Sequence, residues 1–181
     1  MSPGIVARLR LTALLLLTLL IQVTVASDVR VRGVAPDLLL LFTICAGLAG
    51  GSALGMTFGF AAGLLADLFL HTTPLGLSAL TYCLIGFAVG ALRRGVLREG
   101  RLLAPIVALV ASAAGVVLFV LIGAMVGQSQ LSDLGPRRII ETAVVVGVMN
   151  AVLAFAAAPI VAWAAGGSAV GTRTDNSALL K

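Results

Sequence analysis

Long apolar runs separated by short polar connections form the main pattern of this sequence. The runs are about 15 to 25 residues long, enough for an α-helix to cross a bilayer core of about 30 Å. We see none of the short alternating segments that a membrane β-barrel requires. The pattern predicts an all-α, polytopic membrane helix bundle of six transmembrane helices, at about 11–26, 34–49, 52–70, 75–92, 102–126 and 139–163.

The six predicted helices make up one membrane domain over residues 1–165. The connections between them are too short to hold a folded domain, so any activity is expected within the membrane or at its two faces. Residues 166–181, GGSAVGTRTDNSALLK, predict a flexible polar tail.

Two of the runs have more than one interpretation. The first follows Arg8 and Arg10 and ends in VTVAS, which also fits a signal peptide, but the runs that follow favour an uncleaved anchor. The second is short, because 16 helical residues cover only about 24 Å. Segment 34–70, with Gly50 and Gly51 at its centre, is therefore two short spans, a re-entrant hairpin, or one span with a buried arm.

The distribution of basic residues favours two spans in segment 34–70. With six crossings and a cytoplasmic N-terminus, eight basic residues lie inside and four outside, as the positive-inside rule requires. One crossing would export RRGVLREGR, the most basic connection. The inside group is Arg8, Arg10, Arg93, Arg94, Arg98, Arg101, Arg173 and Lys181, and the outside group is Arg30, Arg32, Arg137 and Arg138.

Composition excludes a soluble domain and changes the meaning of the net charge. Hydrophobic residues make up 60% of the chain and charged residues 10%, with a mean hydropathy of +1.16. We therefore attribute the net charge of +5 to arginines beside helix ends that set the topology and contact anionic lipids, and not to nucleic-acid binding. Arg93, Arg94, Arg98 and Arg101 are expected to face the cytoplasm, against anionic lipids or an acidic surface of a partner.

Glycines recur every fourth residue in the third predicted helix, at Gly51, Gly55, Gly59 and Gly63. Small residues at this spacing let helix backbones approach closely in lipid, where van der Waals packing drives association. The fourth helix carries a second pair, Gly86 and Gly90. The two ridges are predicted to pack on each other; a partner helix from another protein and a ligand or ion route are the alternatives.

Asp67 and His71 continue the glycine spacing at the outer end of the third helix. Asp67 is expected to bond the loop backbone or cap the next helix, and the alternative is a polar contact or protonatable group in an outward-facing cavity. The spacing also allows an Asp67–His71 pair, but two ligands without a third do not define a metal site.

Three further polar positions have structural interpretations. Asp37 suits the first turn of the second helix, and Glu141 suits a local ion pair with Arg137 and Arg138 at the outer start of the sixth. Asn150 lies mid-span, where its amide is expected to bond another helix, with a substrate contact as the alternative.

Catalytic and metal-binding patterns cannot be assembled from this chain. Seven acidic residues and one histidine supply no catalytic triad, nucleotide-binding loop or metal cluster. Cys45 and Cys83 fall in apolar runs, where they act as small hydrophobes. We therefore expect no enzyme activity, no catalytic residue, no metal and no cofactor.

The order of these features resembles the MreD family, the rod shape-determining membrane subunits of bacteria. The resemblance covers about residues 8–165 and includes a PDLLLLF segment, the Gly-spaced third helix ending in GLLADLFLHTTPLG, GFAVG in the fourth helix, and the basic loop. Most of the match is carried by Pro36, Gly59, Gly63, Asp67, Pro74, Gly76, Gly86 and Gly90.

The resemblance implies a non-enzymatic scaffold of the cell-elongation machinery that makes peptidoglycan. Its implied partners are MreC, the actin-like MreB, the glycosyltransferase RodA and a penicillin-binding transpeptidase, and its implied location is the bacterial inner membrane, with both termini cytoplasmic. The family is also similar in fold to the substrate-binding membrane subunits of energy-coupling-factor vitamin transporters. A small-molecule binder is therefore the alternative, although one Trp and one Tyr offer little for a vitamin pocket.

Overall fold

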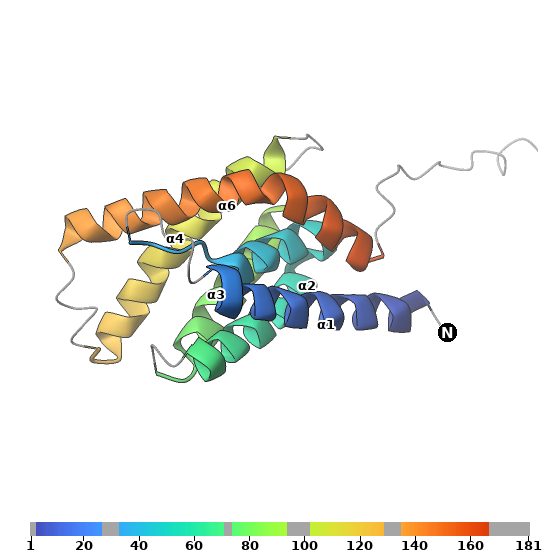
Figure 1. The fold of residues 1–181 in the computed structure, drawn as a ribbon, viewed down its shortest axis with the longest axis horizontal. Helices are drawn as coiled ribbons and strands as arrows, with labels where there is room; N and C mark the ends of the chain where they lie inside the picture. Colours follow the sequence, from blue (N-terminus) through green and yellow to red (C-terminus); the bar gives the residue numbers. More distant parts are fainter. Residues whose placement is uncertain (1–2, 27–32, 71–73, 94–101, 129–134, 167–181) are drawn as a thin grey trace, which may run out of the picture.

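The computed structural model describes residues 3–26, 33–70, 74–93, 102–128 and 135–166, and these contain no β-strand. The chain forms a bundle of helices (Figure 1). Helix α1 (Pro3–Ile21) continues into a short π-helix, η1 (Gln22–Ala26). The others are α2 (Leu38–Leu70), α3 (Leu77–Arg93), α4 (Leu103–Met125) and α6 (Pro136–Ala164).

Four of these helices are long and apolar enough to cross a membrane. They cover Gly4–Thr24, Leu38–Phe69, Leu103–Met125 and Pro136–Ala164, and α3 is a shorter apolar helix. The prediction of an all-α bundle of membrane helices is confirmed at this level. The count of six crossings and the similarity to transporter subunits stay predictions.

Helix α2 is a hairpin of two helical halves that turn back at Gly51. Gly51 has φ 82° and ψ −171°, a conformation that favours glycine because a side chain there would be strained. A Cβ atom built on Gly55 would lie 2.8 Å from Gly47 Cα, and one built on Gly59 would lie 2.8 Å from Thr43 Cγ2. In a straight helix these pairs would be about 12 and 24 Å apart, so the halves lie side by side.

Two expectations for this segment need correction. Gly51 is not a step of a helical ridge, because its positive φ makes it the turn between the two halves. The second predicted helix also begins later, at Leu38 instead of residue 34, because residues 35–37 are not helical. The first half of α2, residues 38–50, is therefore only about 20 Å long.

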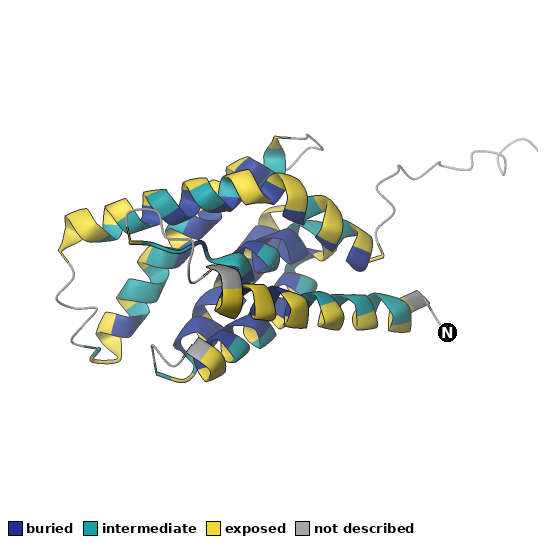
Figure 2. Cartoon of the chain, in the orientation of Figure 1, coloured by how far each residue is buried: buried dark blue, intermediate teal, exposed yellow. Residues whose placement is uncertain are grey.

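Helix α3 lies against both halves of α2 through glycines. A Cβ atom on Gly55 would collide with the Gly86 carbonyl, one on Gly59 with the Tyr82 carbonyl, and one on Gly63 with the backbone at Ser78 and Ala79. Gly90 in turn lies against the backbone of Gly51 and Ser52, and Gly47 faces Gly86 and Gly90. The glycine ridges therefore pack on each other within the chain, which leaves α2 and α3 the most buried part of the bundle (Figure 2).

Helices α4 and α6 form an antiparallel pair that extends beyond the α2–α3 core (Figure 1). The pair is close, because a Cβ atom on Gly147 would lie 2.9 Å from the Leu109 carbonyl oxygen. Helix α1 lies on the outside and meets the end of α6, where the Arg10 guanidinium sits 4.3 Å from the centre of the Trp163 ring. The start of α1 and the end of α6 are therefore at the same end of the molecule.

We predict that Gly59→Ala destabilises the protein by about 1 to 3 kcal/mol, because its methyl group would overlap the Tyr82 carbonyl. Gly4→Ala is the matched control, since it also adds one methyl group to a helix but meets nothing within 4 Å. The control should be neutral or slightly stabilising, because alanine is the better helix former. Thermal unfolding of both variants in detergent measures the difference, and equal stabilities would contradict the packing described above.

Candidate functional site

Asp37 holds the start of α2 through both oxygens of its carboxylate. Its Oδ1 accepts a hydrogen bond from the Leu40 N–H at 2.9 Å, which is the geometry of a helix N-cap. Its Oδ2 accepts a hydrogen bond from the Tyr82 hydroxyl of α3 at 2.6 Å. The residue expected to suit the first turn of this helix thus also ties α2 to α3.

The backbone next to Asp37 is bonded by two amide side chains from other helices. The Gln22 Nε2 group donates to the Pro36 carbonyl at 3.1 Å, and the Gln22 Oε1 atom accepts from the Leu38 N–H at 2.8 Å. The Asn150 Nδ2 group donates to the Asp37 carbonyl at 3.1 Å and to Ser112 Oγ at 2.9 Å. Gln22, Asp37, Tyr82, Ser112 and Asn150 form what we call the interior polar network.

The interior polar network lies near the middle of two long apolar helices. Asn150 is at the midpoint of α6 and is fully buried, and Ser112, also fully buried, is near the midpoint of α4. The first half of α2 is about 10 Å shorter than a hydrocarbon core of about 30 Å. Non-helical backbone within a membrane protein needs partners within the protein, and the network supplies them for Pro36 and Asp37.

Asp67 caps the next helix. Its Oδ2 accepts hydrogen bonds from the N–H groups of Gly76 at 2.8 Å and Ala79 at 3.3 Å, and its Oδ1 accepts one from Ser78 at 3.2 Å. The side chain is 3% exposed. A carboxylate at this position bonds the unpaired N–H groups of the first turn of α3 and interacts favourably with its dipole. The geometry is that of a cap and not of a carboxylate open to a cavity.

Arg93, at the end of α3, reaches back to the α2 turn. Its Nη1 donates to the Ala49 carbonyl at 2.6 Å, one of the carbonyls left without a helical partner just before Gly51. The turn of the hairpin and the start of the basic loop are thus at the same end of the bundle. Arg94, Arg98 and Arg101 lie outside the described residues, as does His71.

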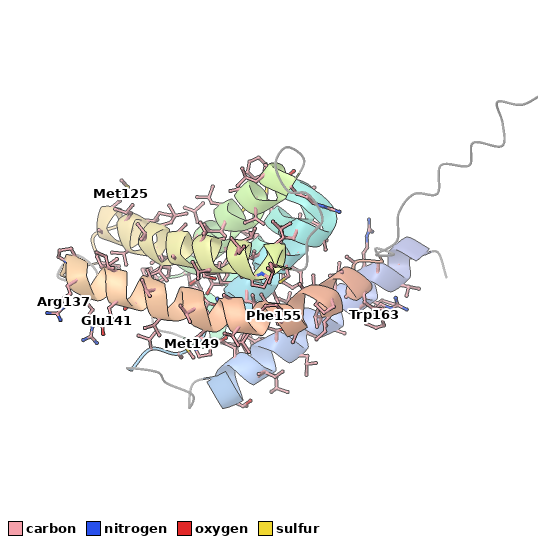
Figure 3. The ribbon with its side chains drawn as sticks, turned by 90° about the horizontal axis from the view of Figure 1, so that it is seen from above. Met125, Arg137, Glu141, Met149, Phe155 and Trp163 are labelled. Carbon is pink, nitrogen blue, oxygen red and sulfur yellow. The ribbon has the colours of Figure 1, made fainter. Side chains whose placement is uncertain are left out.

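Arg137, Arg138 and Glu141 are exposed at the start of α6. Figure 3 shows Arg137 and Glu141 at the same end of the molecule as Met125, the last residue of α4. This end is remote from Trp163. The structure does not bring these charged residues together with Asp67 or with the interior polar network.

Sequence reasoning missed three members of the interior polar network, Gln22, Tyr82 and Ser112. Gln22 gave a usable signal, because it is an amide at the end of an otherwise apolar run. Tyr82 and Ser112 are ordinary residues for a membrane helix and gave none. The Tyr82 and Ser112 hydroxyls and the Gln22 amide are bonded within the network. Asn150 donates through Nδ2, while its buried Oδ1 atom has no hydrogen-bond partner among the described residues. The hydrogen bonds that are present connect the helices, so their role is structural.

Replacing Asp67 with Asn should destabilise the protein by about 1 to 2 kcal/mol, because the amide keeps one acceptor oxygen and turns an N–H donor towards other N–H groups. Glu141→Gln is the matched control, since it makes the same chemical change at an exposed position of α6, where the cost should be under about 0.5 kcal/mol. Thermal unfolding in detergent compares them. Equal effects would mean that the Asp67 cap contributes nothing to stability.

Comparison with known proteins identifies a family. The profile of the rod shape-determining protein MreD family matches residues 4–156, which is most of the chain. No curated protein and no solved structure gives a significant match. The match includes the α2–α3 core, the interior polar network and the Asp67 cap described above. The chain therefore belongs to the MreD family of rod shape-determining membrane proteins.

Proposed function

We propose that this protein is a non-enzymatic scaffold of the cell-elongation machinery, which holds MreC and the peptidoglycan synthesis enzymes RodA and a penicillin-binding transpeptidase together in the membrane. The match to the MreD family is the observation that carries the proposal. The polar interior supports it, because the Asp37 and Asp67 carboxylates are engaged as helix caps. Polar groups occupied in this way hold helices in place and leave the outer faces of the bundle for partners.

The membrane helix of MreC is proposed to bind the outer face of α1. The glycine ridges are already filled by contacts within the chain, which leaves them no room for a second helix. Helix α1 is the least embedded of the long helices, and much of its length is coloured as exposed or intermediate (Figure 2). Leu16, Leu17 and Leu20 are each more than half exposed and share one side of α1.

Six crossings, with both termini in the cytoplasm of a bacterial cell, are the proposed topology. The α2 hairpin supports it, because a chain that turns back at Gly51 returns to the side where it started. Arg93 lies beside that turn, and Arg10 lies beside Trp163. The first contact joins the start of the basic loop to the α2 turn, and the second joins the start of α1 to the end of α6. In the proposed topology both pairs lie on the cytoplasmic side, where Arg93, Arg94, Arg98 and Arg101 would meet anionic lipids, MreB or another acidic partner surface.

Cysteine accessibility tests this topology. In a background where Cys45 and Cys83 are replaced by Ala, single cysteines replace Ser132, Val96 or Ser177. A membrane-impermeant maleimide should label the Ser132→Cys variant from outside the cell, and the other two only in inverted vesicles. Outside labelling of Val96→Cys would mean that α2 crosses the membrane once, because an odd number of crossings there would export the basic loop.

Affinity purification of the tagged protein from its own membrane tests the proposed scaffold. We expect MreC and the elongation enzymes to co-purify. Replacing Leu16, Leu17 and Leu20 with Ala should reduce MreC recovery at least several-fold. The control replaces three exposed residues of α4, Ile106, Val110 and Met125, with Ala and should leave recovery unchanged.

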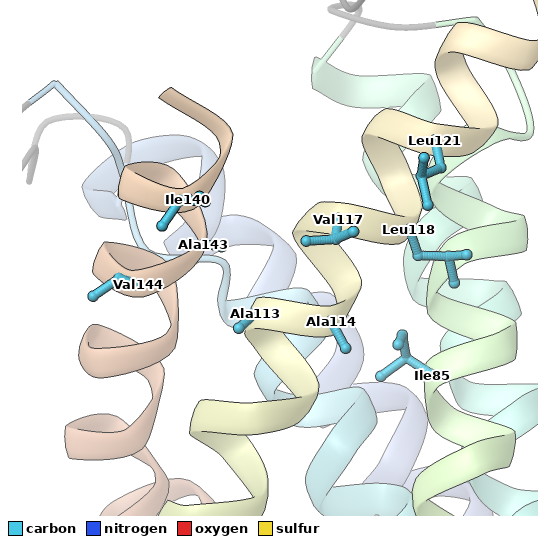
Figure 4. Close-up of a pocket in the computed structure, with 9 residues that line it drawn as sticks. All are labelled: Ile85, Ala113, Ala114, Val117, Leu118, Leu121, Ile140, Ala143 and Val144. Carbon is cyan, nitrogen blue, oxygen red and sulfur yellow. The ribbon is translucent and has the colours of Figure 1, made fainter. Parts of the chain in front are cut away.

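Two results would contradict this proposal. Equal recovery of MreC with both triple variants would move the contact away from α1. Recovery of an ATPase pair and a bound vitamin, without MreC, would instead make the protein a transporter subunit. We do not propose that second function, because a vitamin pocket needs placed polar groups, and the groove found among the described residues is lined by aliphatic side chains (Figure 4).

A further inference from the structure

An apolar groove runs along α4, between α6 on one side and α3 on the other (Figure 4). Its volume is about 520 Å³. Ala113 and Ala114 of α4 and Ala143 of α6 have small side chains, which leave space in the groove. Branched side chains such as Val117 and Val144 form its sides. The groove is open to the surroundings, since Val117 is 41% and Val144 56% exposed.

Two exposed arginines lie beside one end of the groove. Arg137 precedes the groove residues Ile140 and Val144 by three and seven positions, so the three share one side of α6. Arg138 is adjacent and also exposed. Glu141 carries a negative charge in the same turn, which leaves this cluster with a net charge of +1 from two arginines and one glutamate.

We propose that the groove binds an anionic phospholipid, with an acyl chain along α4 and the headgroup phosphate at Arg137 and Arg138. The arrangement matches such a molecule at both ends, because an apolar channel is continuous with a basic cluster near the membrane boundary. A lipid phosphate next to arginines gains charge-assisted hydrogen bonds, and the chain fills space that would otherwise lack contacts. This site is distinct from Arg93, which lies at the end of α3 beside the α2 turn.

The length of the groove and the charge beside it favour a lipid over a partner helix. From Ala113 to Leu121 the groove follows about 12 Å of α4, or little more than two turns. A partner helix on so short a stretch would make no use of the arginines, whereas a flexible acyl chain can follow the groove and place its headgroup beside them.

Native mass spectrometry of the purified protein tests the site. The protein is equilibrated in detergent with equal amounts of dioleoylphosphatidylglycerol and dioleoylphosphatidylcholine, and the ratio of the two bound lipids is measured. The Arg137→Gln, Arg138→Gln variant should lose its preference for phosphatidylglycerol by about fivefold for each arginine. Its matched control, Arg8→Gln with Arg10→Gln, removes the same charge at the opposite end and should keep the preference.

A second pair of variants tests the acyl-chain position. Val117→Phe fills the groove and should reduce retention of both lipids, whereas Val152→Phe, at an exposed position of α6 outside the groove, should not. Equal loss of preference in both arginine variants, or undiminished retention in Val117→Phe, would overturn the proposed site. So would a photocrosslink from position 117 to a helix of another protein in the cell membrane. The measurement uses the chain alone, so its outcome is independent of the proposed scaffold role.

Discussion

Backbone contact between α3 and the two halves of α2 is the constraint on which the rest of the structure depends. In lipid, apolar side chains gain little by leaving their surroundings, so helices associate through close van der Waals packing. Gly55, Gly59 and Gly63 bring the second half of α2 onto α3, and Gly47 does the same for the first half. This packing leaves no space for even one added methyl group at these positions. It also offsets the loss of helical hydrogen bonds at the hairpin turn of Gly51.

The start of the α2 hairpin has backbone N–H and C=O groups without helical partners, and side chains from other helices bond them. Residues 35–37 before α2 are not helical, so the first N–H groups of α2 and the preceding carbonyls need other partners, because each unpaired group is costly in an apolar environment. Asp37 caps the helix from within the segment, while Gln22 arrives from the end of α1 and Asn150 from the middle of α6. The same hydrogen bonds that satisfy the backbone therefore fix the positions of α1 and α6 relative to the core. At the other end of the second half, Asp67 performs the corresponding task for α3.

These interactions place the polar and the close-packed groups inside and leave aliphatic faces outside. Such a molecule is suited to presenting fixed surfaces to other membrane components. The exposed leucines of α1 and the groove along α4 are different kinds of surface. One is a convex stripe for another helix, and the other is a hollow with positive charge beside it. The proposed scaffold role and the proposed lipid site would use different faces of the same bundle.

The sequence by itself determined the helical class, the approximate helix boundaries and the family, because run length, hydropathy and glycine spacing are local properties. It also indicated that Gly50 and Gly51 interrupt a helix, but it left three arrangements of segment 34–70 open. Only the tertiary structure decided that the two halves of α2 lie side by side, since this depends on whether Gly47, Thr43 and α3 can all approach the glycine face of the second half. Asp67 could be interpreted as a cap because its N–H partners follow soon after it in the chain. The partners of Asp37 could not be predicted from the sequence, because Tyr82 and Asn150 are 45 and 113 residues away and reach it only when the bundle has formed.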